Sequence, residues 1–214
     1  MQIKKYLNTV IELMICLLGI SSVVLTFFEE YEFHENILYP LRFLTVDGTS
    51  FLVLTVILNK AIGKSRRFSG FLFFLRLAAV TTETVIFIVV LIGLVPQAPE
   101  HPIVENYHMF NMHILIPILS MIWFVLQEYV KRTITIKNCA RGTAGILVYG
   151  VCIIPCILTG VIGEKNIPYS FLDIYSNPVY YTIIVLMVSY FSSLLLSFLF
   201  LKISNKKNGA DTKK

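Results

Sequence analysis

The chain has 214 residues, 56% of them hydrophobic and 14% charged, and its formal net charge is +5. With a mean hydropathy of +0.75 it is too apolar for an ordinary soluble domain, so its solvent is expected to be a lipid bilayer. The basic residues are divided among short connections, which gives no reason to expect a nucleic-acid partner.

Six stretches are long and apolar enough to cross a membrane, for which a helix needs about 20 mainly apolar residues. They cover residues 6–28, 43–62, 71–95, 109–130, 143–162 and 178–201. The first resembles a signal peptide, but its apolar run is too long and no small-residue cleavage pattern follows, so we expect a retained span. The expected fold class is all-α: a polytopic membrane protein with one six-helix domain over residues 1–204 and a disordered polar tail over 205–214.

Basic and acidic connections alternate along the chain. The basic segments carry Lys4, Lys5, Lys60, Lys64, Arg66, Arg67, Lys131, Arg132, Lys137, Arg141, Lys202, Lys206, Lys207, Lys213 and Lys214. The other three connections carry Glu29, Glu30, Glu32, Glu35, Glu100, Glu105, Glu164 and Asp173 against Arg42 and Lys165. Because positively charged loops stay in the cytoplasm, this pattern predicts a multi-pass protein of the cell membrane with both termini cytoplasmic.

Three charged residues fall inside the expected spans, where each costs about 2.5 to 3.5 kcal/mol unless it has a partner, a cavity or a function. They are Glu12 in the first stretch and Arg76 and Glu83 in the third. Glu12 and Arg76 lie at similar depths near the inner leaflet, which predicts an ion pair between helices; the alternative is that both extend to the interface. Glu83 shares a helix face with Arg76 and lies deeper.

The second stretch begins with a polar group of residues. Thr45 and Thr49 fall on one helix face, whereas Asp47 points almost opposite to Thr45. Asp47 is therefore expected to cap the helix or to pair with Arg42. Thr45 is the member of this group that we expect to be functional.

The fourth stretch carries a polar seam, because Asn106, His113, Ser120 and Gln127 recur every seven residues. Pro117 is expected to loosen the backbone near His113 by removing an N–H donor. His113 lies at a depth comparable to that of Thr45, so the two share a level in the membrane. The structural alternative is that the seam only joins helices and that Thr45 only caps one.

The remaining features of the sequence favour structural interpretations. The glycine-rich fifth stretch predicts close helix packing and a kink near Pro155. Tyrosines near the span ends, Tyr169 among them, are typical of interfacial anchors. The four cysteines are Cys16, Cys139, Cys152 and Cys156. They have neither metal-type spacing nor paired histidines beside them, so we expect buried thiols without disulfides. We expect the protein to hold neither a metal nor a cofactor.

Three segments occur in order and at appropriate spacing: RFLTVDGTSF (42–51), NMHILIPIL (111–119) and PYSFLDI (168–174). They resemble the androgen-induced family of integral-membrane hydrolases, which cleave fatty acid esters of hydroxy fatty acids, and its bacterial six-helix relatives. Arg76 in FFLRL resembles the family's basic residue early in the third span. Pro117 lies four residues after His113, as in the bacterial relatives, whereas the hydrolytic members have it one residue later. Asp47 is one residue closer to the threonine than the aspartate of the hydrolases.

The resemblance implies that Thr45 is a nucleophile and that His113 is the base that takes its proton. It implies an amphiphilic lipid ester as substrate, bound near the outer leaflet of a bacterial cytoplasmic membrane, in a cavity between the second, third and fourth spans. The residues expected to support or line this site are Arg42, Asp47, Thr49, Arg76, Glu83, Asn111, Ser120 and Asp173. The alternatives are a non-catalytic membrane protein that binds a lipid or small ligand, an accessory subunit, or a secondary transporter, for which no inverted repeat is visible.

Overall fold

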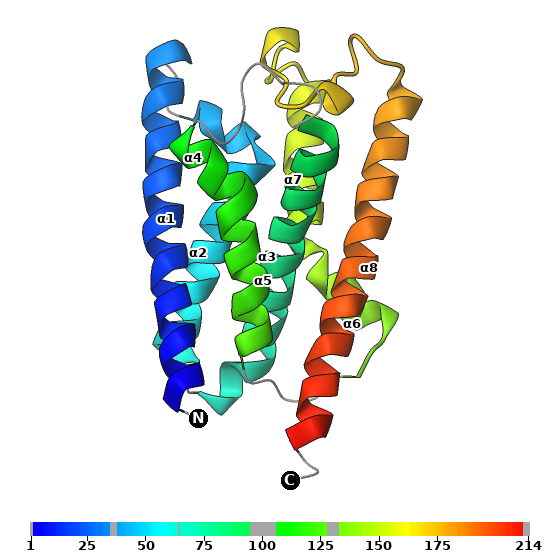
Figure 1. The fold of residues 1–214 in the computed structure, drawn as a ribbon. Coiled ribbons are helices and arrows are strands. Elements are labelled where there is room, and N and C mark those ends of the chain that lie inside the picture. Colours follow the sequence, from blue (N-terminus) through cyan, green and yellow to red (C-terminus); the bar gives the residue numbers. More distant parts are fainter. Residues whose placement is uncertain (1, 35–37, 64, 95–105, 128–132, 212–214) are drawn as a thin grey trace.

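A computed structural model describes residues 2–34, 38–63, 65–94, 106–127 and 133–211 of the chain. Over these residues the chain forms helices joined by turns, and the long helices run side by side as a bundle (Figure 1). The expected all-α class is confirmed for this part of the chain. The first helix begins and the last helix ends at the same end of the bundle (Figure 1).

The long helices are α1 (Gln2–His34), α2 (Leu44–Ile62), α3 (Ser69–Val89) and α8 (Val179–Asp211). A further long helix consists of α4 (Tyr107–Phe110), the π turn η6 (Asn111–Leu115) and α5 (Ile116–Leu126). The π turn η3 (Val90–Leu94) follows α3. Short 3-10 turns lie in the connections: η1 (Tyr39–Arg42), η2 (Arg66–Phe68), η7 (Glu164–Asn166) and η8 (Ser170–Leu172).

Within the described ranges, five helices are long and apolar enough to cross a membrane: α1, α2, α3, the α4–η6–α5 helix and α8. The fifth predicted span is instead a pair of helices, α6 (Ile136–Gly142) and α7 (Ala144–Leu158), which meet at an angle of 59°. The chain therefore has the helices of a membrane protein, and the bent pair adds one crossing if its two helices form one span.

The bend lies at Thr143, between α6 and α7, and not near Pro155, which lies inside α7. Glycines on both sides of the break explain its position. A Cβ atom on Gly142 would overlap Ser197 of α8, and one on Gly145 would overlap Thr82 of α3. Close packing on two different neighbours turns the two halves in different directions.

Some predicted boundaries differ from the structure or lie outside the described residues. The predicted ends of the third and fourth spans, at Val95 and Val130, and the last three residues of the chain are outside the described ranges. Residues 205–211, which we expected in a disordered tail, continue α8. The intrahelical hydrogen bonds of a helix need no apolar surroundings, so a helix can extend beyond its apolar stretch.

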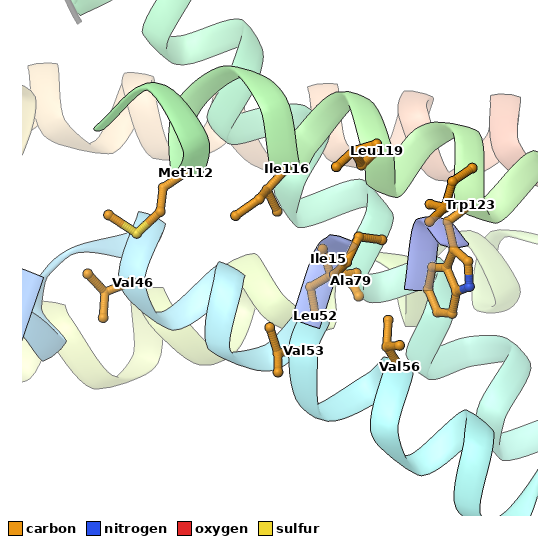
Figure 2. Close-up of a cluster of buried hydrophobic side chains, with 11 residues drawn as sticks. Ile15, Val46, Leu52, Val53, Val56, Ala79, Met112, Ile116, Leu119 and Trp123 are labelled. Atoms are coloured by element: carbon orange, nitrogen blue, oxygen red, sulfur yellow. The ribbon is translucent and has the colours of Figure 1, made fainter. Parts of the chain in front are cut away.

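The buried core that positions the functional site joins α1, α2, α3 and α5. In Figure 2, Met112 lies near Val46 at one end of this cluster and Trp123 lies near Val56 at the other. In a bilayer such contacts stabilise through van der Waals packing, because lipid tails are as apolar as the side chains. Val46 and Met112 are the chain neighbours of Thr45 and His113, so this packing also sets the relative position of those two residues.

A second buried core lies on the other side of the bundle. Phe73, Phe124 and Phe200 join α3, α5 and α8 in this second core.

The four cysteines are free thiols, and Cys152 on α7 is exposed, contrary to the expectation of buried thiols. Because α7 and α8 lie at the edge of the bundle, their outward faces are apolar surfaces of the kind that lipid covers.

The expected ion pair between Glu12 and Arg76 is replaced by another arrangement. The cation beside Glu12 is Lys60 of α2, with its Nζ 2.7 Å from Glu12 Oε2. Arg76 donates instead to Asn59 Oδ1 at 2.8 Å. Gln127 joins the two groups, since its Nε2 donates to Glu12 at 3.2 Å and its Oε1 accepts from Arg76 at 3.4 Å. Depth alone could not distinguish Lys60 from Arg76 as the partner, because both cations reach the same level.

Candidate functional site

The structure brings the Thr45 hydroxyl and the His113 imidazole together, although 68 positions separate them in the chain. Thr45 Oγ1 lies 3.4 Å from His113 Nε2. Thr45 stands in the first turn of α2 and His113 in the π turn η6, and both are buried, at 5% and 7% exposure. The separation is slightly longer than the 2.6–3.2 Å or so of a formed catalytic hydrogen bond, as is common in sites without substrate.

A hydrogen bond on the other side of the ring fixes the protonation pattern of His113. His113 Nδ1 lies 2.8 Å from the carbonyl oxygen of Met109. A carbonyl can only accept, so Nδ1 carries the proton, and Nε2 of the neutral ring is left as an acceptor facing Thr45. The imidazole is thus oriented as a base toward the threonine hydroxyl.

The helix around His113 is wound as a π turn rather than as regular α-helix. The N–H of Ile116 donates to the carbonyl of Asn111, five residues earlier, and Pro117 follows without an N–H of its own. The predicted loosening of the backbone is therefore localised at His113. A π turn also rotates the residues before it relative to those after it, which breaks the predicted seven-residue seam.

Tyr169 is a third side chain at the site, and we had expected it to be an interfacial anchor. Its hydroxyl lies 3.4 Å from Thr45 Oγ1, beside the first turn of α2. Burial raises the pKa of Tyr169 above its ordinary value, so its O–H is retained at neutral pH. The PYSFLDI segment was the available signal, but a loop sequence does not show which of its side chains turns inward.

Aromatic and polar contacts hold the loop that carries Tyr169 over the start of α2. The Tyr169 ring stacks on Phe171 at 5.2 Å and meets the edge of Phe43 at 6.4 Å. Arg42 of η1 lies over the Tyr39 ring at 3.3 Å and donates to the carbonyl of Asn166 in η7. Burial lowers the pKa of Arg42 from its ordinary value. Arg42 thus supports the loop and does not contact Thr45.

The first turn of α2 presents backbone N–H groups beside Thr45. Its cap residue is Phe43, whose side chain makes no capping hydrogen bond, and the N–H groups of Val46 and Asp47 turn back to the Phe43 carbonyl. Those of Leu44 and Thr45 lie at the position where a helix has no acceptors of its own. Asp47 is therefore not the cap.

Asp47 and Asp173 lie apart from the Thr45–His113 contact. The Asp47 side chain makes no hydrogen bond within the described residues, and the carboxylate that acts electrostatically on Arg42 is that of Glu30. Asp173 accepts from the backbone N–H groups of Tyr175 and Ser176 at 3.0 Å and so closes a turn of the loop. The hydrogen bonds from Ser176, followed by that from Tyr175, hold the pKa of Asp173 below its ordinary value.

Three other expected supporting residues make their contacts elsewhere: Asn111 and Arg76 bond to neighbouring helices, and Ser120 bonds within α5. Asn111 donates to Ser22 of α1 at 3.2 Å, and Ser120 donates to the carbonyl of Pro117 at 2.7 Å. Arg76 belongs to the group around Gln127 near the ends of α1 and α5. The structure does not bring these side chains to Thr45.

Glu83 is fully buried one helical turn below the pair, at the contact of α3 with α2. Its Oε1 would lie 3.6 Å from a Cβ atom built on Gly48, and among the described residues neither its two carboxyl oxygens nor the nearby Thr49 hydroxyl has a hydrogen-bond partner. Thr49 lies one turn after Thr45 on the same face of α2, so Glu83 is about 6 Å deeper than Thr45 by helical rise. It therefore borders the site without reaching His113.

Among the described residues there is no group of three or more His, Cys, Asp and Glu side chains that could hold a metal ion. Comparisons of the chain with protein-family models, with curated proteins and with solved structures found no match. The fold and the site define a helical protein of membrane type with a cluster of buried Thr45 and His113 and half-buried Tyr169 near one end of its bundle.

Proposed function

We propose that this protein is an integral-membrane hydrolase of amphiphilic lipid esters, with Thr45 as nucleophile and His113 as general base. The observation that carries the proposal is the contact between Thr45 Oγ1 and the unprotonated Nε2 of a ring whose Nδ1 is bound to Met109. A threonine hydroxyl is a weak nucleophile unless a base receives its proton. The resemblance in segments 42–51 and 111–119 assigns the same two residues.

The reaction follows from these positions. Nε2 of His113 takes the hydroxyl proton as Thr45 Oγ1 bonds to the ester carbonyl carbon, and the carbonyl π electrons move to the oxygen. When the oxyanion collapses, the bond to the alkoxy group breaks and Nε2 returns the proton to the leaving alcohol. Water then attacks the acyl-threonine in the same manner, which releases the fatty acid and restores the Thr45 hydroxyl.

The location of the site suits a substrate that is part of the membrane. Thr45 and His113 lie toward the end of the bundle opposite the two termini. The proposal takes six spans with the basic connections in the cytoplasm, so that this end faces outward and the reacting ester belongs to the outer leaflet of a bacterial cytoplasmic membrane. There an ester carbonyl meets interfacial water while its chains stay in hydrocarbon. The chemistry requires no metal or cofactor.

Covalent capture tests the proposal directly. A fluorophosphonate probe is expected to modify purified wild-type protein at Thr45, and Thr45→Val, which keeps the side-chain shape without the hydroxyl, is expected to remain unlabelled. His113→Ala should lose labelling and hydrolysis of a long-chain 4-nitrophenyl ester, because Nε2 is gone. Mass spectrometry locates the adduct, and thermal unfolding in detergent shows that both variants are folded. Full activity in either folded variant contradicts the mechanism.

The burial of the pair favours a second candidate, a non-catalytic membrane protein that binds a lipid or small ligand. Thr45 and His113 are only 5% and 7% exposed, as expected for residues that join helices. In that case the probe leaves the wild type unmodified, and His113→Ala lowers the unfolding temperature. The same two measurements therefore separate the two candidates.

A further inference from the structure

We infer that Tyr169 is a further catalytic residue of this site: its hydroxyl, together with the backbone N–H groups of Leu44 and Thr45, donates hydrogen bonds to the oxyanion formed when Thr45 attacks an ester. This inference rests on the proposed function and adds the group that the hydroxyl–imidazole pair lacks. Acyl transfer needs donors directed at the developing negative charge as well as a base.

The directions of the hydrogen bonds at the site follow from what each group can do. The Met109 carbonyl accepts from Nδ1 of His113, so Nε2 must accept from the Thr45 hydroxyl. The Thr45 oxygen then has lone pairs left, and the Tyr169 hydroxyl at 3.4 Å is the donor toward them. The N–H groups of Leu44 and Thr45, in the first turn of α2 beside this pair, have no acceptor within the helix. The hydroxyl donors therefore point in one sequence, from Tyr169 to Thr45 to His113.

When the Thr45 oxygen reacts, the best acceptor for the Tyr169 hydroxyl changes from that oxygen to the oxyanion. When Thr45 Oγ1 bonds to the carbonyl carbon, one of its lone pairs enters the new bond and it becomes a poorer acceptor, while the former carbonyl oxygen beside it gains a full negative charge. A donor 3.4 Å from Oγ1 is close enough to turn to that oxygen, which effective donors approach to about 2.7–3.1 Å. The hydrogen bond of Tyr169 is thus stronger in the transition state than in the ground state.

The loop around Tyr169 is anchored on both sides, which holds the hydroxyl in position. On one side Arg42 donates to the Asn166 carbonyl. On the other side Thr182 of α8 donates to the Phe171 carbonyl at 3.0 Å, and Asn177 donates to the Ser170 carbonyl at 2.9 Å. A donor that is held in place before the reaction loses little free energy to reorganisation during it.

Tyr149 is a matched control in the same cluster. Its hydroxyl donates to the Arg42 carbonyl at 2.7 Å, and no hydrogen bond joins it to Thr45 within the described residues. Loss of this hydroxyl removes a partly buried hydrogen bond of a tyrosine and leaves the Tyr169 hydroxyl beside Thr45 in place. Any effect common to Tyr149→Phe and Tyr169→Phe is therefore structural.

The test compares wild type, Tyr169→Phe and Tyr149→Phe in the rate of fluorophosphonate labelling and in hydrolysis of 4-nitrophenyl octanoate. Phenylalanine keeps the stack on Phe171 and removes only the hydroxyl. The expected result for Tyr169→Phe is a fall in kcat of about 100-fold, the effect of losing one oxyanion donor, with KM changed by only a few-fold. Tyr149→Phe is expected to retain the wild-type kcat.

The outcomes distinguish a failure of the proposed hydrolase function from a failure of the oxyanion role of Tyr169. If wild type is not labelled, or if a folded Thr45→Val is labelled equally, the proposed function fails. If wild type is labelled and folded Tyr169→Phe reacts as fast or faster, the hydroxyl is not an oxyanion donor and this inference is overturned. Should Tyr169→Phe fail to fold, difluorotyrosine at position 169 keeps the hydroxyl and makes it more acidic. The alkaline limb of the kcat profile must then move to lower pH, and an unmoved limb overturns the inference equally.

Discussion

At the scale of single residues, the polar side chains of this bundle belong to separate groups at different depths. Thr45, His113 and Tyr169 meet near one end. Glu12 and its partners meet near the other end, where Trp123 also donates to Glu12 Oε1 at 3.1 Å. Because every polar atom within a bilayer needs a partner, the second group has a sufficient structural explanation without chemistry.

The group around Glu12 predicts a specific coupling energy. In a double-mutant cycle of Glu12→Gln and Lys60→Met, we expect a coupling of up to about 1 kcal/mol, because Lys60 is 61% exposed and solvent screens the pair. The cycle of Glu12→Gln with Arg76→Met is expected to give a smaller value, since those charges meet only through Gln127. Denaturant unfolding in detergent measures both cycles. A larger coupling to Arg76 would restore the ion pair that the sequence had suggested.

The residue pattern predicted the depth of the site's two helical side chains but not the partners of every polar group. Thr45 and His113 could be placed at one level, because depth follows from counting residues along an apolar helix. The inward turn of Tyr169 could not be predicted, because it depends on a loop packed against η1 and Phe43. The ion pair of Glu12 with Lys60 could not be predicted either, because Lys60 and Arg76, on neighbouring helices, lie at a depth similar to that of Glu12.

At the scale of elements, two departures from regular helix have local causes or effects: the π turn at His113 and the break between α6 and α7. The π turn η6 places the His113 ring toward α2 and ends at a proline-containing turn. The break between α6 and α7 follows the glycines that bring these helices against α8 and α3. Apolar length predicted the existence of these helices, but hydropathy carries no signal for a π turn or for which residue of a glycine-rich span bends.

The glycine contacts lead to a prediction about stability. Gly142→Ala is expected to destabilise the protein by about 1–3 kcal/mol, because the new methyl group would overlap Ser197 and crowd Leu77, whose Cγ is 3.0 Å from the Cβ position. Gly150→Ala is the matched control, since its nearest neighbour is Ile154 at 4.0 Å. A helical alanine there should be neutral or stabilise by up to about 1 kcal/mol. Equal unfolding midpoints for the two variants would show that the α6–α8 approach is not close.

At the scale of the whole molecule, the side of the membrane on which the two free ends lie determines which leaflet the proposed site faces. The first and last helices have their free ends at one end of the bundle, and η7, η8 and the start of α2 lie at the other (Figure 1). If the basic end is cytoplasmic, a lipid in the outer leaflet has its ester group at the level of Thr45. If the orientation were reversed, the same site would face the inner leaflet and a different pool of lipids.

Cysteine labelling in intact cells tests this orientation. In a variant without the four native cysteines, Ser176→Cys in the loop after η8 is expected to react with a membrane-impermeant maleimide from outside, because Ser176 is exposed at the end that carries Tyr169. Ser65→Cys, exposed between α2 and α3, is expected to react only after permeabilisation. The opposite pattern would place Thr45 at the cytoplasmic face and would redirect the search for substrate to inner-leaflet esters. Labelling of both positions from one side would mean that the α6–α7 pair does not cross the membrane, since the loop after η8 would then lie on the same side as the connection between α2 and α3.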